Sequence, residues 1–127
     1  MNLNNLRWLA GLLEGEGCFH FNPNRRSVGS YIWIKLAMTD KDVVEKAATI
    51  MGCNVQGPYI RKGTTYKPVY VATLYGRYAV AWMMTLYQLM GTRRKEAIHK
   101  ILIHYKTSAE LSHRIRKPIV RLEGGWK

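Results

Sequence analysis

The sequence is poor in cysteine and in acidic residues, and it has no long apolar run. Its only cysteines are Cys18 and Cys53, with no CxxC pair, which excludes zinc fingers and disulfide-stapled domains and favours a reducing, intracellular compartment. No segment reaches the roughly 20 apolar residues of a membrane-spanning helix, and the first residues lack the basic start of a secretory signal. We therefore expect a soluble protein with no membrane partner.

The scarcity of acids leaves a strongly basic chain. Eight Asp and Glu stand against 20 Lys and Arg, a formal net charge of +12 over 127 residues. A chain of this length forms one ordinary core, so we expect one globular domain. The charge indicates a nucleic-acid binder, and the eight tyrosines, several among basic residues, favour that over a merely basic protein or one bound to anionic membrane.

The hydrophobic pattern predicts an α+β chain in which an antiparallel sheet is covered by helices on one face. Asn4 or Asn5 can cap the first helix, and the last helix follows a cap at Thr92. The first expected helix runs from residue 6 to the glycines at 15–17, and the others span 41–51, 77–90 and 93–106. The expected strands span 18–24, 29–38, 54–61 and 66–75, with turns at 24–27 and 62–65.

Alternation within the strands predicts which face each side chain takes. In the first hairpin, Phe19 and Phe21 face the core, as do the aliphatic residues of 32–38, so Trp33 and Lys35 face outward. In the last strand both assignments are open, and we favour an outward face for Val69, Val71 and Thr73 over the set Tyr70, Ala72 and Leu74. Pro58 and Pro68 move both strands of the second hairpin toward sheet edges or bulges.

The sequence also predicts how the later helices begin and which of their sides are buried. Residues 39–42 predict a capping box before a helix whose inner stripe is Val43, Ala47, Ile50 and Met51. Residues 77–90 are almost all apolar, which predicts a helix buried on most sides. The last helix begins with three cations at 93–95; this opposes the helix dipole, so either phosphate lies nearby or the run is simply solvated.

Residues 9–17, LAGLLEGEG, combine helix-breaking glycines with acids. Gly11 and Gly15 each cost a helix about 1 kcal/mol relative to alanine, but lie four residues apart on one side, where another backbone can approach closely. Glu14 and Glu16 point to different sides, and Gly17 ends the helix. Glu16 then lies at the negative end of the helix dipole, a conflict that a cation would remove.

These nine residues resemble the LAGLIDADG motif of homing endonucleases. They match it at the first four positions and the last, and keep acids at both acidic positions. The order of elements also matches the αββαββα unit of that family. The resemblance covers about residues 3–106, which we take as a domain over 1–106, followed by a basic extension over 107–127. It implies a DNA-binding saddle on the free face of the sheet.

The resemblance implies a homodimer, because the family needs two such helices packed side by side. It also implies that Glu16 binds a catalytic Mg²⁺, with the Gly15 carbonyl as a further ligand, and that Mn²⁺ or Ca²⁺ can substitute for binding. Glu14 is as consistent with capping or packing as with a role at the metal. The implied contacts between the two motif helices are Leu9, Ala10, Gly11, Leu13 and Gly15.

Further site residues follow from the family pattern. A polar residue after the second strand, Thr39 or Asp40, would contact the water network, and Arg93 would stabilise charge on the phosphate or contact the backbone. The sheet would lie in the major groove of duplex DNA. The implied DNA-contacting residues are His20, Asn22, Arg25, Arg26, Tyr31, Trp33, Lys35, Arg61, Lys62, Lys67, Arg94 and Lys95.

The implied function is site-specific double-strand DNA cleavage, by phosphodiester hydrolysis across the minor groove with 3′ overhangs. An intron- or phage-encoded enzyme of this kind would act in a bacterial or phage-infected cell, in the cytoplasm or nucleoid, or in an organelle. The chain departs from the pattern at Glu16, where the family has Asp; the extra methylene moves the carboxylate by about 1.5 Å. The alternative is a non-cleaving protein on the same fold, an RNA splicing maturase or a DNA-binding regulator.

Overall fold

The structure is a computed structural model that describes residues 2–22, 32–63 and 65–107. The expected turn at 24–27 and the extension beyond residue 107 lie outside these residues. The elements follow one another in the order α1 (Leu3–Glu16), β1 (Gly17–Phe21), β2 (Ile32–Met38), α2 (Lys41–Met51), β3 (Val55–Tyr59), β4 (Val69–Tyr75), α3 (Gly76–Leu86), the 3-10 turn η1 (Tyr87–Leu89) and a final helix over 92–107.

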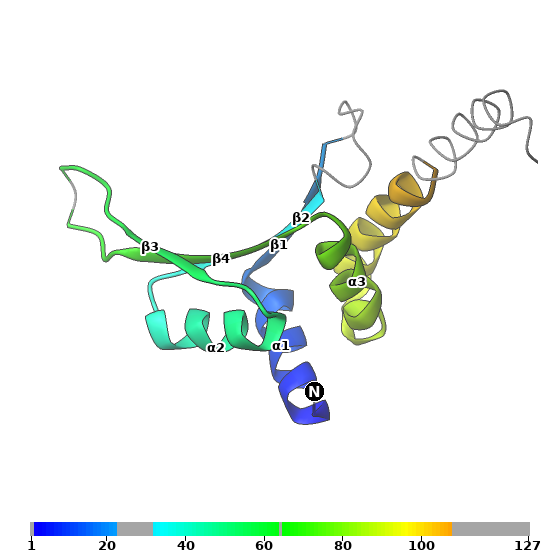
Figure 1. The fold of residues 1–127 in the computed structure, drawn as a ribbon, viewed down its shortest axis with the longest axis horizontal. Helices are drawn as coiled ribbons and strands as arrows, with labels where there is room; N and C mark the ends of the chain where they lie inside the picture. The colour runs from blue at the N-terminus through cyan, green and yellow to red at the C-terminus, as the bar shows by residue number, and fades with distance from the viewer. Residues whose placement is uncertain (1, 23–31, 64, 108–127) are drawn as a thin grey trace, which may run out of the picture.

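The four strands form one antiparallel sheet in the order β1-β2-β4-β3. The sheet is curved, and the helices lie on its convex side, so its opposite face is open and concave (Figure 1). This confirms the expected α+β arrangement with helices on one face. No helix among the described residues is long and apolar enough to cross a membrane.

The core lies between the sheet and the helices, and β2 shows why it forms there. Ile32, Ile34 and Leu36 are buried, whereas Lys35 between them is exposed, so the period-two alternation gives the strand one apolar face. The first hairpin follows the predicted faces. The largest fully buried side chains are Leu9, Leu13, Ile34, Leu36, Val44, Met83, Leu86, Ile98 and Ile101.

The first helix begins earlier than predicted. Its N-cap is Asn2, whose side-chain oxygen accepts a hydrogen bond of 2.7 Å from the Asn5 N–H, so the prediction of Asn4 or Asn5 as the cap is wrong. At the other end α1 stops at Glu16, as predicted. The Gly17 N–H donates back to the Leu13 carbonyl and closes the last turn.

The second helix has the predicted position but a shifted inner stripe. Its buried residues are Val44, Ala47, Ala48 and Met51. The prediction of Val43 in the inner stripe is therefore wrong by one position. Asp40 is the N-cap, but its side chain makes no capping hydrogen bond, which contradicts the capping box.

The second hairpin is partly as expected. β3 is an edge strand with an irregular register between Gln56 and Tyr59, which confirms the effect expected of Pro58. Pro68 precedes β4, and β4 lies inside the sheet, so the expectation of an edge for that strand is wrong.

The third helix is buried on one side only. Its buried residues are Ala79, Val80, Met83 and Leu86, and it ends before the 3-10 turn η1. Tyr78 and Met84 are 62% and 64% exposed, so the prediction of burial on most sides is wrong. Apolar composition without a clear period did not reveal which side faces the core.

The final helix is capped by Gly91 rather than by Thr92. The Lys95 N–H donates to the Gly91 carbonyl at 2.9 Å, the first i to i−4 bond of the helix. Thr92 is therefore already helical, and the prediction of Thr92 as the cap is wrong by one residue.

Candidate nucleic-acid interface and active site

The C-terminal end of α1 presents an exposed carboxylate. Glu16 is the last helical residue, and β1 starts at the next position without a loop. Gly17 has an extended backbone, so its φ does not require glycine. Glycine is required at residue 17 because any larger residue would clash: its Cβ would lie 2.8 Å from the Leu13 carbonyl oxygen. The last glycine of the motif therefore allows the strand to leave the helix directly beside Glu16.

One face of α1 is open at both of its glycines. A Cβ built at Gly11 or Gly15 meets nothing within 4 Å, and both residues are exposed. In contrast, Leu9, Ala10 and Leu13 are at most 4% exposed, because they pack in the core of their own chain. These side chains have almost no surface left for a partner, so the candidate contact surface of α1 narrows to the side that carries Gly11 and Gly15.

Glu14 is engaged within the chain. Its side-chain oxygen Oε1 accepts a 2.6 Å hydrogen bond from the Gly91 N–H, and its backbone carbonyl accepts a 3.1 Å bond from Arg94 Nε. The Arg94 guanidinium also lies 5.8 Å from the centre of the Phe19 ring. Of the two open interpretations of Glu14, these contacts match capping and packing. They also bring Arg94, a predicted DNA contact, to the end of α1.

The concave face carries an aromatic row across three strands. His20 pairs with Trp33 and Trp33 with Tyr75 in the strand register. The rings of His20 and Trp33 are stacked with centroids 4.2 Å apart, and those of Trp33 and Tyr75 are 6.5 Å apart. Next to this row, exposed Lys35 is paired with Thr73. Predicted contacts His20, Trp33 and Lys35 thus lie together on the helix-free face.

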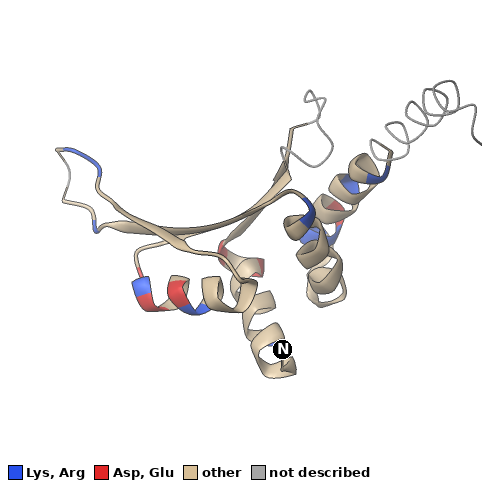
Figure 2. Ribbon diagram, viewed as in Figure 1, with Lys and Arg blue, Asp and Glu red and all other residues tan. Residues whose placement is uncertain are grey.

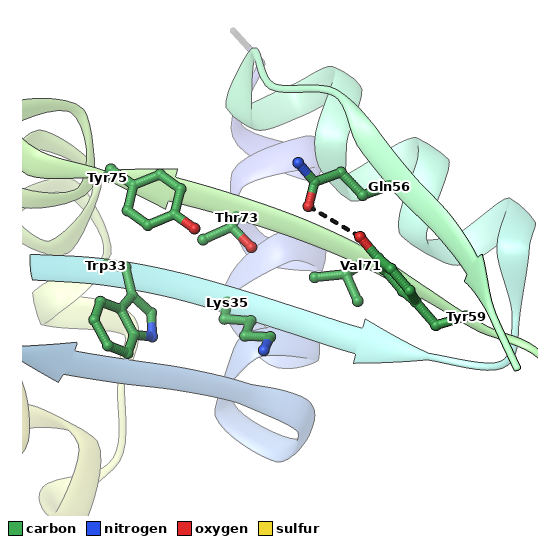
Figure 3. Close-up of a pocket in the computed structure, with 7 residues that line it drawn as sticks. All are labelled: Trp33, Lys35, Gln56, Tyr59, Val71, Thr73 and Tyr75. Carbon is green, nitrogen blue, oxygen red and sulfur yellow. Dashed lines mark hydrogen bonds between the residues drawn. The ribbon is translucent and has the colours of Figure 1, made fainter. Parts of the chain in front are cut away.

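A hollow of about 420 Å³ lies over the centre of this face. Figure 3 shows Trp33 and Lys35 from β2 beside residues of β3 and β4. The Tyr59 hydroxyl donates a long, 3.5 Å hydrogen bond to Gln56 Oε1. The lining residues are Trp33, Lys35, Gln56, Tyr59, Val71, Thr73 and Tyr75.

Five of those lining residues were missing from the predicted contacts. The preference for an outward face of Val71 and Thr73 is confirmed, because Ala72 and Leu74 join the core while Val71 and Thr73 line the hollow. That alternation could have been followed one step further, to Tyr75. For β3 no clear alternation exists in the sequence, since the strand is short and its register irregular.

Basic residues gather at the connection between β3 and β4, which extends beyond the sheet (Figure 2). Arg61, Lys62 and Lys67 are all exposed there. Arg61 and Lys67 line a second hollow of about 510 Å³ together with Thr39 and the 70% exposed Tyr66. An exposed aromatic ring among cations is suited to contact with phosphates and bases.

The remaining predicted residues are more scattered. Asp40 is exposed at the start of α2 and Arg93 is exposed in the first turn of the final helix. Lys95 lies with Nζ 5.6 Å from the centre of the Tyr87 ring, and Asn22 is half-buried just after β1. The predicted contacts Arg25, Arg26 and Tyr31 lie outside the described residues.

The donors at the end of α1 are of the right kind for a hard divalent cation. A carboxylate on Glu16 and the carbonyl of Gly15 are oxygen ligands, as Mg²⁺ prefers. Within the described part of one chain, no group of three His, Cys, Asp or Glu side chains lies close enough to hold a metal. Water, nucleic acid and a second copy of the chain are sources of further ligands for a cation at Glu16.

The two cysteines have different surroundings. Burial raises the pKa of the Cys53 thiol, against a smaller lowering by a backbone hydrogen bond at Thr73, so the thiol stays protonated at neutral pH. Cys18 is a free, exposed thiol on the same face of β1 as His20.

No protein-family model and no curated protein matches the sequence. Solved structures do match the fold. The homing endonuclease I-CvuI in complex with its target superposes with a TM-score of 0.56 at 17% identity, over 83% of this chain and 70% of that one.

Two intron-encoded homing endonucleases complexed with DNA also match. The group I intron-encoded I-CeuI has a TM-score of 0.64 at 12% identity, over 89% of this chain and 59% of that one. The archaeal I-Vdi141I has a TM-score of 0.55 at 13% identity, over 87% and 70%. At these identities the likeness concerns the fold, and this chain has the α+β fold of the LAGLIDADG homing endonucleases.

Proposed function

We propose that the protein is a site-specific DNA endonuclease that acts as a homodimer with a divalent metal. The observation that carries the proposal is the exposed Glu16 carboxylate at the end of α1, one residue before the strand that carries His20 on the concave face. A carboxylate that could bind a hard cation thus lies next to a basic, aromatic surface. The structural neighbours that were solved with DNA support duplex DNA as the partner.

The concave face suits the major groove. Lys35 can donate to a guanine edge, and Gln56 can pair with an adenine edge. The rings of Trp33 and Tyr75 offer apolar contact to thymine methyl groups. At the rim, Arg61, Lys62 and Lys67 would contact phosphates and fix the register without reading the sequence.

A second copy would complete the site. Gly11 and Gly15 leave one side of α1 free for close approach of another helix, and a two-fold axis there would bring two Glu16 carboxylates together. Like charges so close favour binding of divalent cations. Each copy would serve one DNA strand, which gives a double-strand break.

Different residues of the chain would serve different parts of the phosphodiester hydrolysis. Glu16 and the Gly15 carbonyl would hold the cation, and Mg²⁺ bound there supplies Lewis-acid stabilisation of the phosphate oxygens. Asp40 or Thr39 would orient water for attack on phosphorus, and the Arg93 guanidinium would stabilise the charge that develops on the phosphate.

A second candidate is a nucleic-acid-binding protein that does not cleave, a maturase or a regulator. It is favoured by the engagement of Glu14 with Gly91, which leaves Glu16 as the only motif carboxylate per chain that is open to a cation. The concave face would serve this function equally well.

The two candidates differ in a cleavage assay. The protein is incubated with a library of DNA duplexes in Mg²⁺, and bound and cut molecules are sequenced separately. We expect wild type to cut selected sites in Mg²⁺, and Glu16→Gln to bind the same sites in Ca²⁺ but to leave them uncut in Mg²⁺. The control Glu45→Gln, which changes an exposed acid on α2, should cut normally in Mg²⁺. Tight, selective binding without cleavage in Mg²⁺ or Mn²⁺ would replace the first candidate by the second.

A further inference from the structure

We propose that Glu14 and Arg94 form a reciprocal cap between α1 and the helix over 92–107, and that Glu14 is a positioning residue for cleavage rather than a metal ligand. The cap joins the end of one helix to the start of another that lies far away in the sequence. The effect on cleavage rests on the proposed endonuclease function, whereas the cap itself can be tested without DNA.

One half of the cap places an anion at a helix N-terminus. Gly91 is the N-cap of the final helix, because its carbonyl accepts the 2.9 Å bond from the Lys95 N–H. Its own N–H has no intrahelical acceptor and donates instead to Glu14 Oε1 at 2.6 Å. A carboxylate there both satisfies the donor and complements the positive end of the helix dipole. Glu14 thus accepts from the N-cap N–H, as the N3 Glu or Gln of a capping box does from within a helix.

The other half places a cation at a helix C-terminus. The last carbonyls of α1 have no partner within the helix, apart from that of Leu13, which accepts from the Gly17 N–H. The Glu14 carbonyl is the next along the chain, and Arg94 Nε donates to it at 3.1 Å. The positive guanidinium therefore lies at the negative end of the α1 dipole. This explains one of the three cations at 93–95, which would be unfavourable at the start of their own helix.

The fit at Gly91 is close. An alanine Cβ at that position would lie 3.3 Å from Glu14 Oε1 and 3.4 Å from Oε2, tighter than ordinary contact. Gly91 is not among the glycines with positive φ, so alanine is compatible with the backbone. Glycine at residue 91 is needed because its small size leaves room for the Glu14 carboxylate.

The cap has a consequence for the candidate active site. It fixes the first turn of the final helix, which carries Arg93, against the end of α1, which carries Glu16 two residues after Glu14. Loss of the Glu14 carboxylate would let this turn shift relative to Glu16. A misplacement of about 1 Å in a catalytic group can cost on the order of 100-fold in rate.

Three substitutions separate positioning from metal binding. In Glu14→Gln the amide oxygen can still accept from the Gly91 N–H, whereas Glu14→Ala removes the acceptor. We expect Glu14→Gln to cut within about fivefold of wild type, Glu14→Ala to be slower by roughly 30- to 100-fold, and both to bind DNA in Ca²⁺ with Kd changed by less than about threefold. Glu16→Gln should not cut. The control Glu45→Gln should behave as wild type. If Glu14→Gln cuts as slowly as Glu14→Ala while its melting temperature equals that of wild type, Glu14 is a metal ligand and the inference is wrong.

A double-mutant cycle tests the cap without DNA. Glu14→Ala should lower the melting temperature by about 4–8 °C, the scale of a lost helix cap. Gly91→Ala should lower it in the wild-type background, because the methyl group displaces the carboxylate, but not in the Glu14→Ala background, where nothing is displaced. Additive effects would overturn the cap. If wild type cuts no DNA, the proposed function fails, while a non-additive cycle would still establish the cap.

Discussion

Replacement of Gly11 by alanine should affect the single chain and the dimer in opposite directions. Within one chain the new Cβ meets nothing within 4 Å, and the position is in the middle of a helix. The substitution should therefore stabilise the chain by about 0.8–1.0 kcal/mol through helix propensity. For a domain of this size, that raises the melting temperature by about 4 °C.

The same substitution should destabilise the dimer. If the two α1 helices cross at their glycines, each added methyl group forces the helices apart. Overpacking costs roughly 1–3 kcal/mol per site, and a two-fold axis doubles it. An added 2 kcal/mol weakens the dimer Kd about 30-fold. Gly11→Leu should weaken association further for the same reason.

Measurements at different protein concentrations separate the effect on dimer formation from the effect on the stability of the single chain. Sedimentation equilibrium gives the dimer Kd, and thermal melts over a range of dilution give the stability of the separated chain. Ala81→Gly, an exposed alanine within α3, is the inverse control and should destabilise the chain by a similar amount without changing the dimer Kd. If Gly11→Ala stabilises the chain and leaves both association and cleavage unchanged, the glycine side of α1 is not the interface.

Other predictions concern the concave face, the core and the thiols. Lys35→Ala should weaken DNA binding by about 1–3 kcal/mol if Lys35 reads a base edge, measured by titration at fixed salt, whereas Lys46→Ala on the opposite side, where Nζ lies 4.2 Å from the Trp8 ring centre, should not. Leu9→Ala should lower the free energy of unfolding by about 2–5 kcal/mol in denaturant titration, because the side chain is fully buried; a smaller loss would contradict its place in the core. The raised pKa of Cys53 leaves less thiolate at a given pH, so its alkylation at pH 8 should be slower than that of exposed Cys18 and should accelerate as pH rises; equal rates in peptide mapping would refute this.

The sequence predicts well what local periodicity determines. In β2 strict alternation separates Ile34 from Lys35, and a one-residue slip would turn every side chain to the wrong face, so the pattern has one solution. In α2 the predicted stripe at 43, 47, 50 and 51 and the observed stripe at 44, 47, 48 and 51 both have helical spacing, so periodicity alone does not decide between Val43 and Val44. A hydrophobic pattern that only marks the apolar side of a helix cannot predict a shift of one residue.

The contacts at the candidate site could not be predicted, because they join distant parts of the chain. Glu14 and Gly91 are 77 positions apart, and Glu14 and Arg94 are 80 apart. The basic run at 93–95 is consistent with a negative group nearby or with a solvated run, and it does not indicate which cation would reach such a group. The negative group that Arg94 reaches is the end of α1 itself, while Arg93 remains exposed.

In the proposed endonuclease, the junction between α1 and β1 would couple recognition of DNA to cleavage. Because the strand begins at the residue after Glu16, no loop can absorb a change in the direction of either element. The register that pairs Gly17 with Leu36 also pairs His20 with Trp33, so the strand pairing that forms the aromatic row fixes the end of the helix as well. A slip of one residue would turn His20 toward the core and move Glu16 along the sheet. The acid is thus held at a constant offset from the concave face, which is the property that cleavage at a fixed distance from the recognised bases requires.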